Sequence, residues 1–166
     1  MPTRLPHPAE SRASNGIFFK VVGEGEPLLL LHGVMATGEM FDPLVPLLKS
    51  GFRMLIPDLR GHGKSGELPG PYDVPALAAD LDAVIAEAGF ERCAVLGYSH
   101  GGAVAQQLAH AKPESLRRMM LACTYLCVQR CNAQGAYGGG RVPIAPYGFQ
   151  FQSTDGRQSC CATVEA

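Results

Sequence analysis

The stretch Leu96–Gly102 constrains this chain more than any other part of its sequence, because it contains a Gly-x-Ser-x-Gly run. The apolar residues just before it predict a strand, and the alanine-rich residues just after it predict a helix. Gly97 and Gly101 allow a turn too tight for larger side chains beside the serine. The pattern therefore predicts a sharp strand–turn–helix bend that holds the Ser99 hydroxyl at its tip. Ser99 is the candidate nucleophile.

Apolar patterns elsewhere predict strands that alternate with helices. Crossover connections of this length imply an α/β fold, a parallel sheet with helices on both faces. In such sheets the working site lies at the carboxyl ends of the strands, where Ser99 is expected. The expected strands are 17–22, 27–31, 52–58, 92–95 and 117–125, and the expected helices are 41–49, 73–89 and 101–112.

Length and charge limit the classes of protein to which this chain can belong. With 166 residues and 46% hydrophobic content it has enough chain for one domain with a core. A net charge of −1 gives no electrostatic footprint for nucleic acid or for an anionic membrane, so neither partner is expected. The amino terminus lacks the apolar run of a signal peptide, which predicts a cytoplasmic protein. The oligomeric state stays open.

Three motifs occur in order along the chain. They are His32-Gly33 after a leucine-rich strand, residues 58–65 (DLRGHGKS) after the next strand, and the Ser99 motif. Together, over about residues 16–125, they resemble the α/β-hydrolase superfamily, most closely its serine esterase, enol-lactonase and haloperoxidase-like branch. The resemblance implies a three-layer sandwich with a nucleophile elbow. It also implies a small ester, lactone or thioester as substrate and no metal or organic cofactor.

The resemblance also implies roles for individual residues. Ser99 would attack the substrate carbonyl and form an acyl-enzyme. The backbone N–H groups of Val34 and His100 would form the oxyanion hole, which stabilises the charge that develops on the carbonyl oxygen. His32, Gly33 and the two glycines of the Ser99 motif would support this arrangement.

The chain departs from the family pattern after the nucleophile. The family order is serine, then an acid, then a histidine, but only His100 and His110 follow Ser99. The His100 side chain should project away from the serine, and His110 lies about 15 Å further along the helix axis. Thr124 and Tyr125 stand where some members carry the acid. No general base or triad acid is therefore identified, which predicts impaired catalysis. The alternative is a non-catalytic remnant or small-ligand binding module.

Two other histidines, a glycine-rich loop and a group of cysteines are further candidates for a functional role. His32 and His62 follow strand ends and are more typical of residues that hold a loop than of a substitute base. Residues 61–66 fit G-x-G-x-x-G, but no helix opens there, so a nucleotide site is rejected. The spacing of Cys127, Cys131, Cys160 and Cys161 matches no zinc motif, so no metal is expected.

The expected organisation has three parts. Residues 1–15 form a flexible arm, residues 16–125 form the amino-terminal part of an α/β-hydrolase domain, and residues 126–166 form an irregular tail. The abrupt change in composition after residue 125 favours out-of-frame translation over a genuine disordered tail. Truncation of the core after the strand at about 118–123 would leave that strand as an unpaired sheet edge, which predicts poor solubility.

Overall fold

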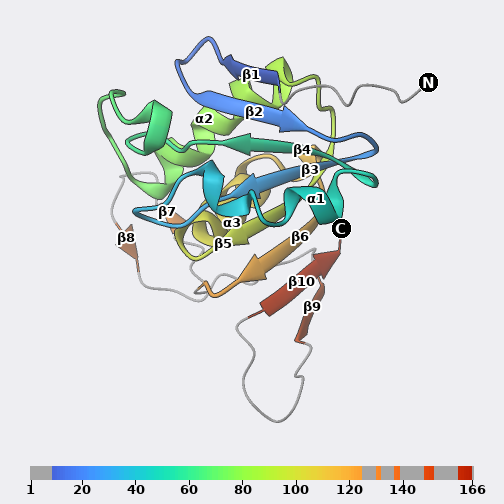
Figure 1. Ribbon diagram of the computed structural model, residues 1–166. Coiled ribbons are helices and arrows are strands. Elements are labelled where there is room, and N and C mark those ends of the chain that lie inside the picture. Colours follow the sequence, from blue (N-terminus) through green and yellow to red (C-terminus); the bar gives the residue numbers. More distant parts are fainter. Residues whose placement is uncertain (1–8, 125–129, 132–136, 139–147, 152–160, 166) are drawn as a thin grey trace, which may run out of the picture.

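The computed structural model describes residues 9–124 together with the short segments 130–131, 137–138, 148–151 and 161–165 (Figure 1). Helices lie on both faces of a twisted central sheet, so the fold is the three-layer α/β class expected from the sequence. None of the helices in these ranges has the length and hydropathy needed to span a bilayer. The strands are β1 (Ala9–Arg12), β2 (Phe18–Val22), β3 (Glu26–Leu31), β4 (Phe52–Pro57), β5 (Cys93–Tyr98), β6 (Leu116–Ala122), β7 (Arg130–Cys131), β8 (Tyr137–Gly138), β9 (Gly148–Phe151) and β10 (Cys161–Glu165). The helices are η1 (Gly38–Phe41), α1 (Val45–Leu48), η2 (Gly63–Ser65), α2 (Val74–Glu87), α3 (His100–Ala111) and η3 (Pro113–Ser115).

The main sheet has the order β1-β2-β4-β3-β5-β6-β10-β9, and β7 pairs separately with β8. The four central strands, β4, β3, β5 and β6, are parallel, as the sequence predicts. β1 and β2 are antiparallel, so the sheet is mixed. The connection from β2 to β3 spans only residues 23–25, which is too short for a crossover, and β2 must therefore run opposite to β3.

The strand β6, the last strand of the expected core, is followed in the sheet by β10 and β9. β10 pairs antiparallel with it, with Cys161 opposite Ala122 and Glu165 opposite Arg118. Its sequence contains Thr163 and Val164, which favour an extended conformation. The edge of β6 that was expected to be unpaired is therefore occupied by β10, and the poor solubility expected of the chain stays a prediction. Most of the tail expected at 126–166 lies outside the described residues.

Part of the expected flexible arm is also in the sheet. Ala9–Arg12 forms β1 along β2, while residues 1–8 lie outside the described ranges. The Arg12 guanidinium donates to the carbonyl oxygens of Gly16 at 3.0 Å and Lys64 at 2.8 Å. The second of these hydrogen bonds ties β1 to the loop that contains Lys64, far along the chain. Residue composition alone does not reveal this contact.

Helix ends follow the local sequence signals. Asp73 caps α2 by accepting a hydrogen bond from the Ala76 N–H at 2.9 Å, and Gly89 follows the helix with a φ of +72°. The helix expected at 41–49 is divided into η1 and α1. Pro43 and Pro46 in this stretch supply no N–H for an uninterrupted helical ladder.

The leucine run of β3 is buried on both faces of the sheet. Leu29 and Leu31 belong to the larger core beneath α2 and α3, whereas Leu28 and Leu30 belong to the smaller core on the α1 side. Successive side chains of a strand point to opposite faces, so a continuous apolar run is what a strand covered on both sides requires. This burial fixes β3 in the centre and brings its carboxyl end beside that of β5.

Candidate functional site

Ser99 is the single residue between the end of β5 and the start of α3. Its backbone has φ 52° and ψ −118°, in the left-handed half of the map that non-glycine residues rarely adopt. Its N–H donates to the Ala122 carbonyl oxygen at 2.9 Å, which fastens the turn to the end of β6. The sharp strand–turn–helix bend expected from the sequence is therefore confirmed.

The glycines around Ser99 are required by close backbone approach. A Cβ atom at Gly97 would lie 2.6 Å from the Gly101 carbonyl oxygen, and one at Gly101 would lie 2.2 Å from the Leu31 carbonyl oxygen. Neither position has room for a side chain, since real Cβ atoms essentially never come this close to another heavy atom. These contacts hold β5, α3 and the end of β3 together beneath the serine.

The backbone strain at Ser99 has a measurable consequence. Ser99→Gly should be more stable than Ser99→Ala by about 1 kcal/mol, because only glycine adopts this conformation without a steric cost. Urea denaturation of the two variants measures the difference. Both variants lose the hydroxyl, so its contribution to stability cancels in the comparison. Equal stability of the two variants would mean that the turn holds alanine without strain.

The loop after β3 packs against this bend. A Cβ atom at Gly33 would lie 3.1 Å from the Cβ of Ser99, so the two residues are in direct contact. Val34, the next residue, is 62% exposed beside the serine. The His100 N–H belongs to the first turn of α3, where backbone donors have no intrahelical acceptor and the helix dipole favours negative charge. The fold thus brings together the segments that carry the two amides selected from the sequence.

His32 joins two loops at the base of this site. The ring is fully buried; its Nδ1 lies 2.8 Å from the Gly33 carbonyl oxygen, and its Nε2 lies 2.9 Å from the Leu59 nitrogen. Because the Leu59 N–H can only donate, Nε2 is the acceptor and Nδ1 carries the proton. Burial is the main cause that lowers the pKa of His32. Both ring nitrogens are engaged, so His32 holds the loop and is not free to act as a base.

Asp58 organises the second motif, a role that the sequence analysis did not assign. Its carboxylate is buried and accepts hydrogen bonds from the Gly38 N–H at 2.7 Å and the Lys64 N–H at 2.8 Å. It therefore connects the loop after β3 with the loop after β4. The sequence contained a signal for this role, because Asp58 directly follows a buried strand. A carboxylate buried at such a position needs hydrogen-bond donors, here backbone N–H groups.

Arg60 anchors the same motif to α2. Its Nε donates to Asp80 Oδ2 at 2.7 Å and its Nη2 to Asp80 Oδ1 at 2.5 Å, while Nη1 donates to the Pro69 carbonyl oxygen. The hydrogen bond to Asp80 is the largest cause that raises the pKa of Arg60. The planar guanidinium matches the carboxylate in both hydrogen bonds, which fixes the direction of the loop.

His62 lies near two other histidines, His32 after β3 and His100 at the start of α3. The His62 ring packs edge-on to His32, with 5.1 Å between ring centroids, and its Nδ1 lies 3.0 Å from the Arg60 carbonyl oxygen. His100 is half-buried, and burial followed by the charge of His62 lowers its pKa. His110 is exposed in the last turn of α3, at the far end of the helix from Ser99.

Other groups in the described part of the chain do not complete a catalytic triad. No described side chain hydrogen-bonds to the Ser99 hydroxyl. Thr124, where some family members carry the acid, has a buried Oγ1 with no described hydrogen-bond partner. Within the described ranges, no three His, Cys, Asp or Glu side chains are grouped so that they could hold a metal ion. The cysteines considered as zinc ligands fall where the structure describes no side chains.

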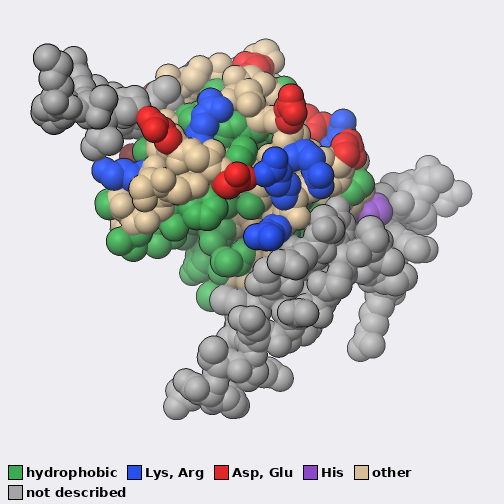
Figure 2. Space-filling view, turned by 90° about the vertical axis from the view of Figure 1, so that its right-hand side faces the viewer, with side chains coloured by type: hydrophobic (Ala, Val, Ile, Leu, Met, Phe, Trp, Pro, Cys, Tyr) green, Lys and Arg blue, Asp and Glu red, His purple; other side chains and the backbone are tan. Residues whose placement is uncertain are grey.

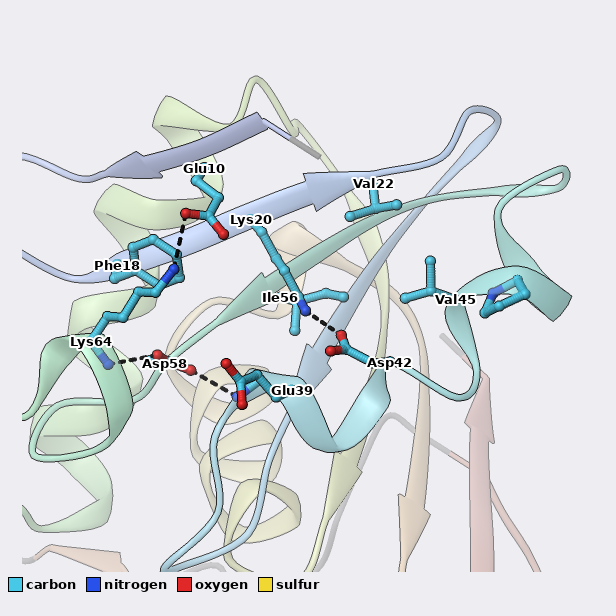
Figure 3. A pocket seen from close by; sticks show the side chains of 12 residues that line it. Glu10, Phe18, Lys20, Val22, Glu39, Asp42, Val45, Ile56, Asp58 and Lys64 are labelled. Carbon is cyan, nitrogen blue, oxygen red and sulfur yellow. Dashed lines mark hydrogen bonds and ion pairs between the residues drawn. The ribbon is translucent and has the colours of Figure 1, made fainter. Parts of the chain in front are cut away.

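A cavity of about 400 Å³ lies away from Ser99, between the edge strands and the η1–α1 segment (Figure 3). Two ion pairs lie on its walls. Lys20 pairs with Asp42, and the Lys64 ammonium lies 2.9 Å from Glu10 and 4.3 Å from the centre of the Phe18 ring. No residue of the Ser99 bend lines this cavity, so it is not part of the site.

Comparisons with known proteins agree with this geometry. The sequence profile of the alpha/beta hydrolase fold matches residues 26–134. A pimeloyl-[acyl-carrier protein] methyl ester esterase of Aeromonas hydrophila is 38% identical over 108 residues, covering 63% of this chain and 40% of that protein. Its counterpart in Klebsiella pneumoniae is 32% identical over 142 residues, covering 85% of this chain and 52% of that protein.

A solved structure is also similar to this chain. The epoxide hydrolase CorEH superposes with a TM-score of 0.68 at 26% identity, covering 83% of this chain and 47% of that protein. The chain thus spans about half the length of the relatives it matches, or less. The profile match includes all three motifs around Ser99 and covers more than half of the sequence. The chain belongs to the alpha/beta hydrolase fold family.

Proposed function

We propose that this chain acts as a serine hydrolase on a small ester, lactone or thioester, with Ser99 as the nucleophile. The observation that carries the proposal is the position of Ser99, strained at the tip of the β5–α3 turn and in contact with the loop of Gly33. Backbone strain of this kind is characteristic of functional sites. The similarity to two methyl ester esterases supports an ester as substrate. Small-molecule binding and the cytoplasmic location expected from the sequence remain predictions.

In the proposed reaction the Ser99 Oγ forms a bond to the substrate carbonyl carbon while its proton passes to a base. The carbonyl oxygen becomes an oxyanion, which the N–H groups of Val34 and His100 would stabilise. Each such donor is typically worth about 3 kcal/mol of barrier. Collapse of the tetrahedral intermediate breaks the bond to the leaving alcohol, and water then releases the acid from Ser99.

The surroundings of Ser99 favour an apolar substrate group. Val34 is 62% exposed, Met35 is 94% exposed and Tyr98 is 37% exposed, all within one or two residues of Ser99 or Gly33. An aromatic ring and a flexible thioether side chain can contact hydrocarbon of varied shape. We propose that they contact the uncharged acyl or alcohol part of the substrate.

The described part of the chain offers Ser99 no general base. Nothing in the described part of the chain accepts a hydrogen bond from the Ser99 hydroxyl, and His32 has both nitrogens engaged. We therefore propose that the chain acylates slowly and turns over poorly, because a serine hydroxyl without a base is a weak nucleophile at neutral pH. The same observation favours the second candidate, a non-catalytic binding module of this fold.

An assay with p-nitrophenyl acetate separates the two candidates. We expect a burst of no more than one nitrophenolate per chain, and an acetyl group on the peptide that contains Ser99, detected by mass spectrometry. Ser99→Ala should abolish both signals, whereas Ser50→Ala, at an exposed turn, should retain them. Identical background release from the parent chain and from Ser99→Ala, with no adduct, would favour the binding module.

A further inference from the structure

The buried His32 ring connects two parts of the site, at the Gly33 end of the loop after β3; Asp58 connects the same two loops further along, at Gly38 and Lys64. On one side its Nδ1–H holds the Gly33 carbonyl oxygen, and on the other its Nε2 accepts the Leu59 N–H. Gly33 contacts Ser99, and Leu59 begins the loop that Asp58 and Arg60 hold in place. The contact between the start of the loop that carries Val34 and the Leu59 backbone therefore depends on whether the imidazole is protonated.

Protonation would reverse one of these two contacts. An imidazolium ion donates from both nitrogens, so a protonated Nε2 would point its hydrogen at the hydrogen of the Leu59 N–H. Two donors facing each other in a buried place leave both without an acceptor, which costs the desolvation of each group. The ring and the Leu59 amide would then have to move apart.

We propose that His32 is an acid-sensitive latch, whose protonation releases the Gly33–Val34 loop from the loop that begins at Leu59. The latch is closed when the ring is neutral and opens when the ring gains a proton. Its effect on catalysis rests on the proposed function, since the moving loop carries the Val34 amide. The structural change itself does not depend on any reaction at Ser99.

The charged and titratable groups that face His32 set the direction of this response. His62 on the η2 side and His100 on α3 add positive charge at low pH and disfavour a second proton nearby, while the Asp58 carboxylate favours one. Burial, the largest cause, disfavours the charged ring. The pKa of His32 therefore lies below its ordinary value in the closed state. The free energy that favours the closed latch therefore has its full value above about pH 6.5. It is lost as the pH falls toward the lower pKa that His32 has in the closed state.

Amide hydrogen exchange at Leu59 tests the latch on the whole chain without substrate. After correction for the intrinsic exchange rate, its protection should fall between pH 7.5 and pH 5.5, by about tenfold at most, because the open ring has the ordinary pKa of about 6.5 and the closed ring a lower one. His32→Gln keeps an oxygen that can accept from Leu59 but does not titrate, so its protection should be the same at both pH values. His110→Gln changes an exposed histidine at the far end of α3 and should show the same fall as the parent chain.

A second measurement covers the case in which His32→Gln does not fold. Imidazole ¹⁵N spectra of the parent chain at pH 7.5 should show a protonated Nδ1 and a bare Nε2 for His32, and its titration midpoint should lie below the ordinary histidine value of about 6.5. The opposite tautomer, or a midpoint at or above that ordinary value, would overturn the latch. Protection of Leu59 that does not change with pH, or a fall that persists in His32→Gln, would overturn it as well. A chain without Ser99 reactivity would leave these readouts unaffected.

Discussion

Replacing Gly101 with alanine is expected to lower the free energy of unfolding by about 3 kcal/mol, at the upper end of the cost of overpacking. The added Cβ would lie 2.2 Å from the Leu31 carbonyl oxygen and 2.5 Å from that of His32. Both atoms belong to the backbone at the end of β3, so no side chain can rotate away. The start of α3 would have to separate from the central strand, and with it the turn that holds Ser99.

Gly51→Ala is the matched control for this substitution. Gly51 has an ordinary φ, and a Cβ there would meet nothing within 4 Å. Its substitution should therefore leave the stability within about 0.5 kcal/mol of the parent chain, as for most surface changes. Thermal or urea unfolding of both variants measures the contrast. A Gly101→Ala variant as stable as Gly51→Ala would show that α3 and β3 do not approach as closely as described.

Replacing Arg60 with alanine is expected to cost about 3 kcal/mol of unfolding free energy. The loss leaves the Asp80 carboxylate buried without its guanidinium partner, and removing one member of a buried pair typically costs more than the pair contributes. The value is at the lower end for buried pairs, because Arg60 keeps some contact with solvent and the Asn15 amide still donates to the Asp80 carboxylate oxygen Oδ1 at 3.4 Å. The loop that carries His62 would lose its anchor to α2.

Asp82→Ala, on the same helix, provides the comparison with an exposed pair. Its carboxylate lies 3.6 Å from the Lys112 ammonium, with both side chains about half exposed. Exposed ion pairs contribute little, so this change should cost less than about 1 kcal/mol. On the face shown in Figure 2, other acidic and basic side chains also lie close together at the surface. Equal losses for Arg60→Ala and Asp82→Ala in urea denaturation would refute a special role for the Arg60–Asp80 pair.

Much of the fold could be predicted from the sequence because its signals are local. The apolar run of β3, the Asp73 cap and the Gly89 stop each act over a few residues, and each is found where expected. The Ser99 bend is equally local, since its flanking glycines and the strand and helix around it are contiguous in the chain.

Two other strands of the sheet could not be predicted. β1 pairs with the nearby β2 but is a short polar strand that also depends on the distant Lys64, and β10 covers β6 across some forty residues of chain. A short polar strand has no periodic pattern strong enough to identify it. Pairing across such distances depends on register and on which edge remains open, and neither is visible in a local window.

For the candidate site, the sequence by itself determined which residue stands at the turn and which glycines allow it, because a tight bend restricts its own residues sterically. Only the tertiary structure decided what His32, Asp58 and Arg60 do. Each is polar and adjacent to a strand end, which is compatible with catalysis, binding or support. Their hydrogen bonds to Leu59, Gly38 and Asp80 assign them to support, since a buried polar group is defined by the partners that satisfy it, and those partners come from other elements.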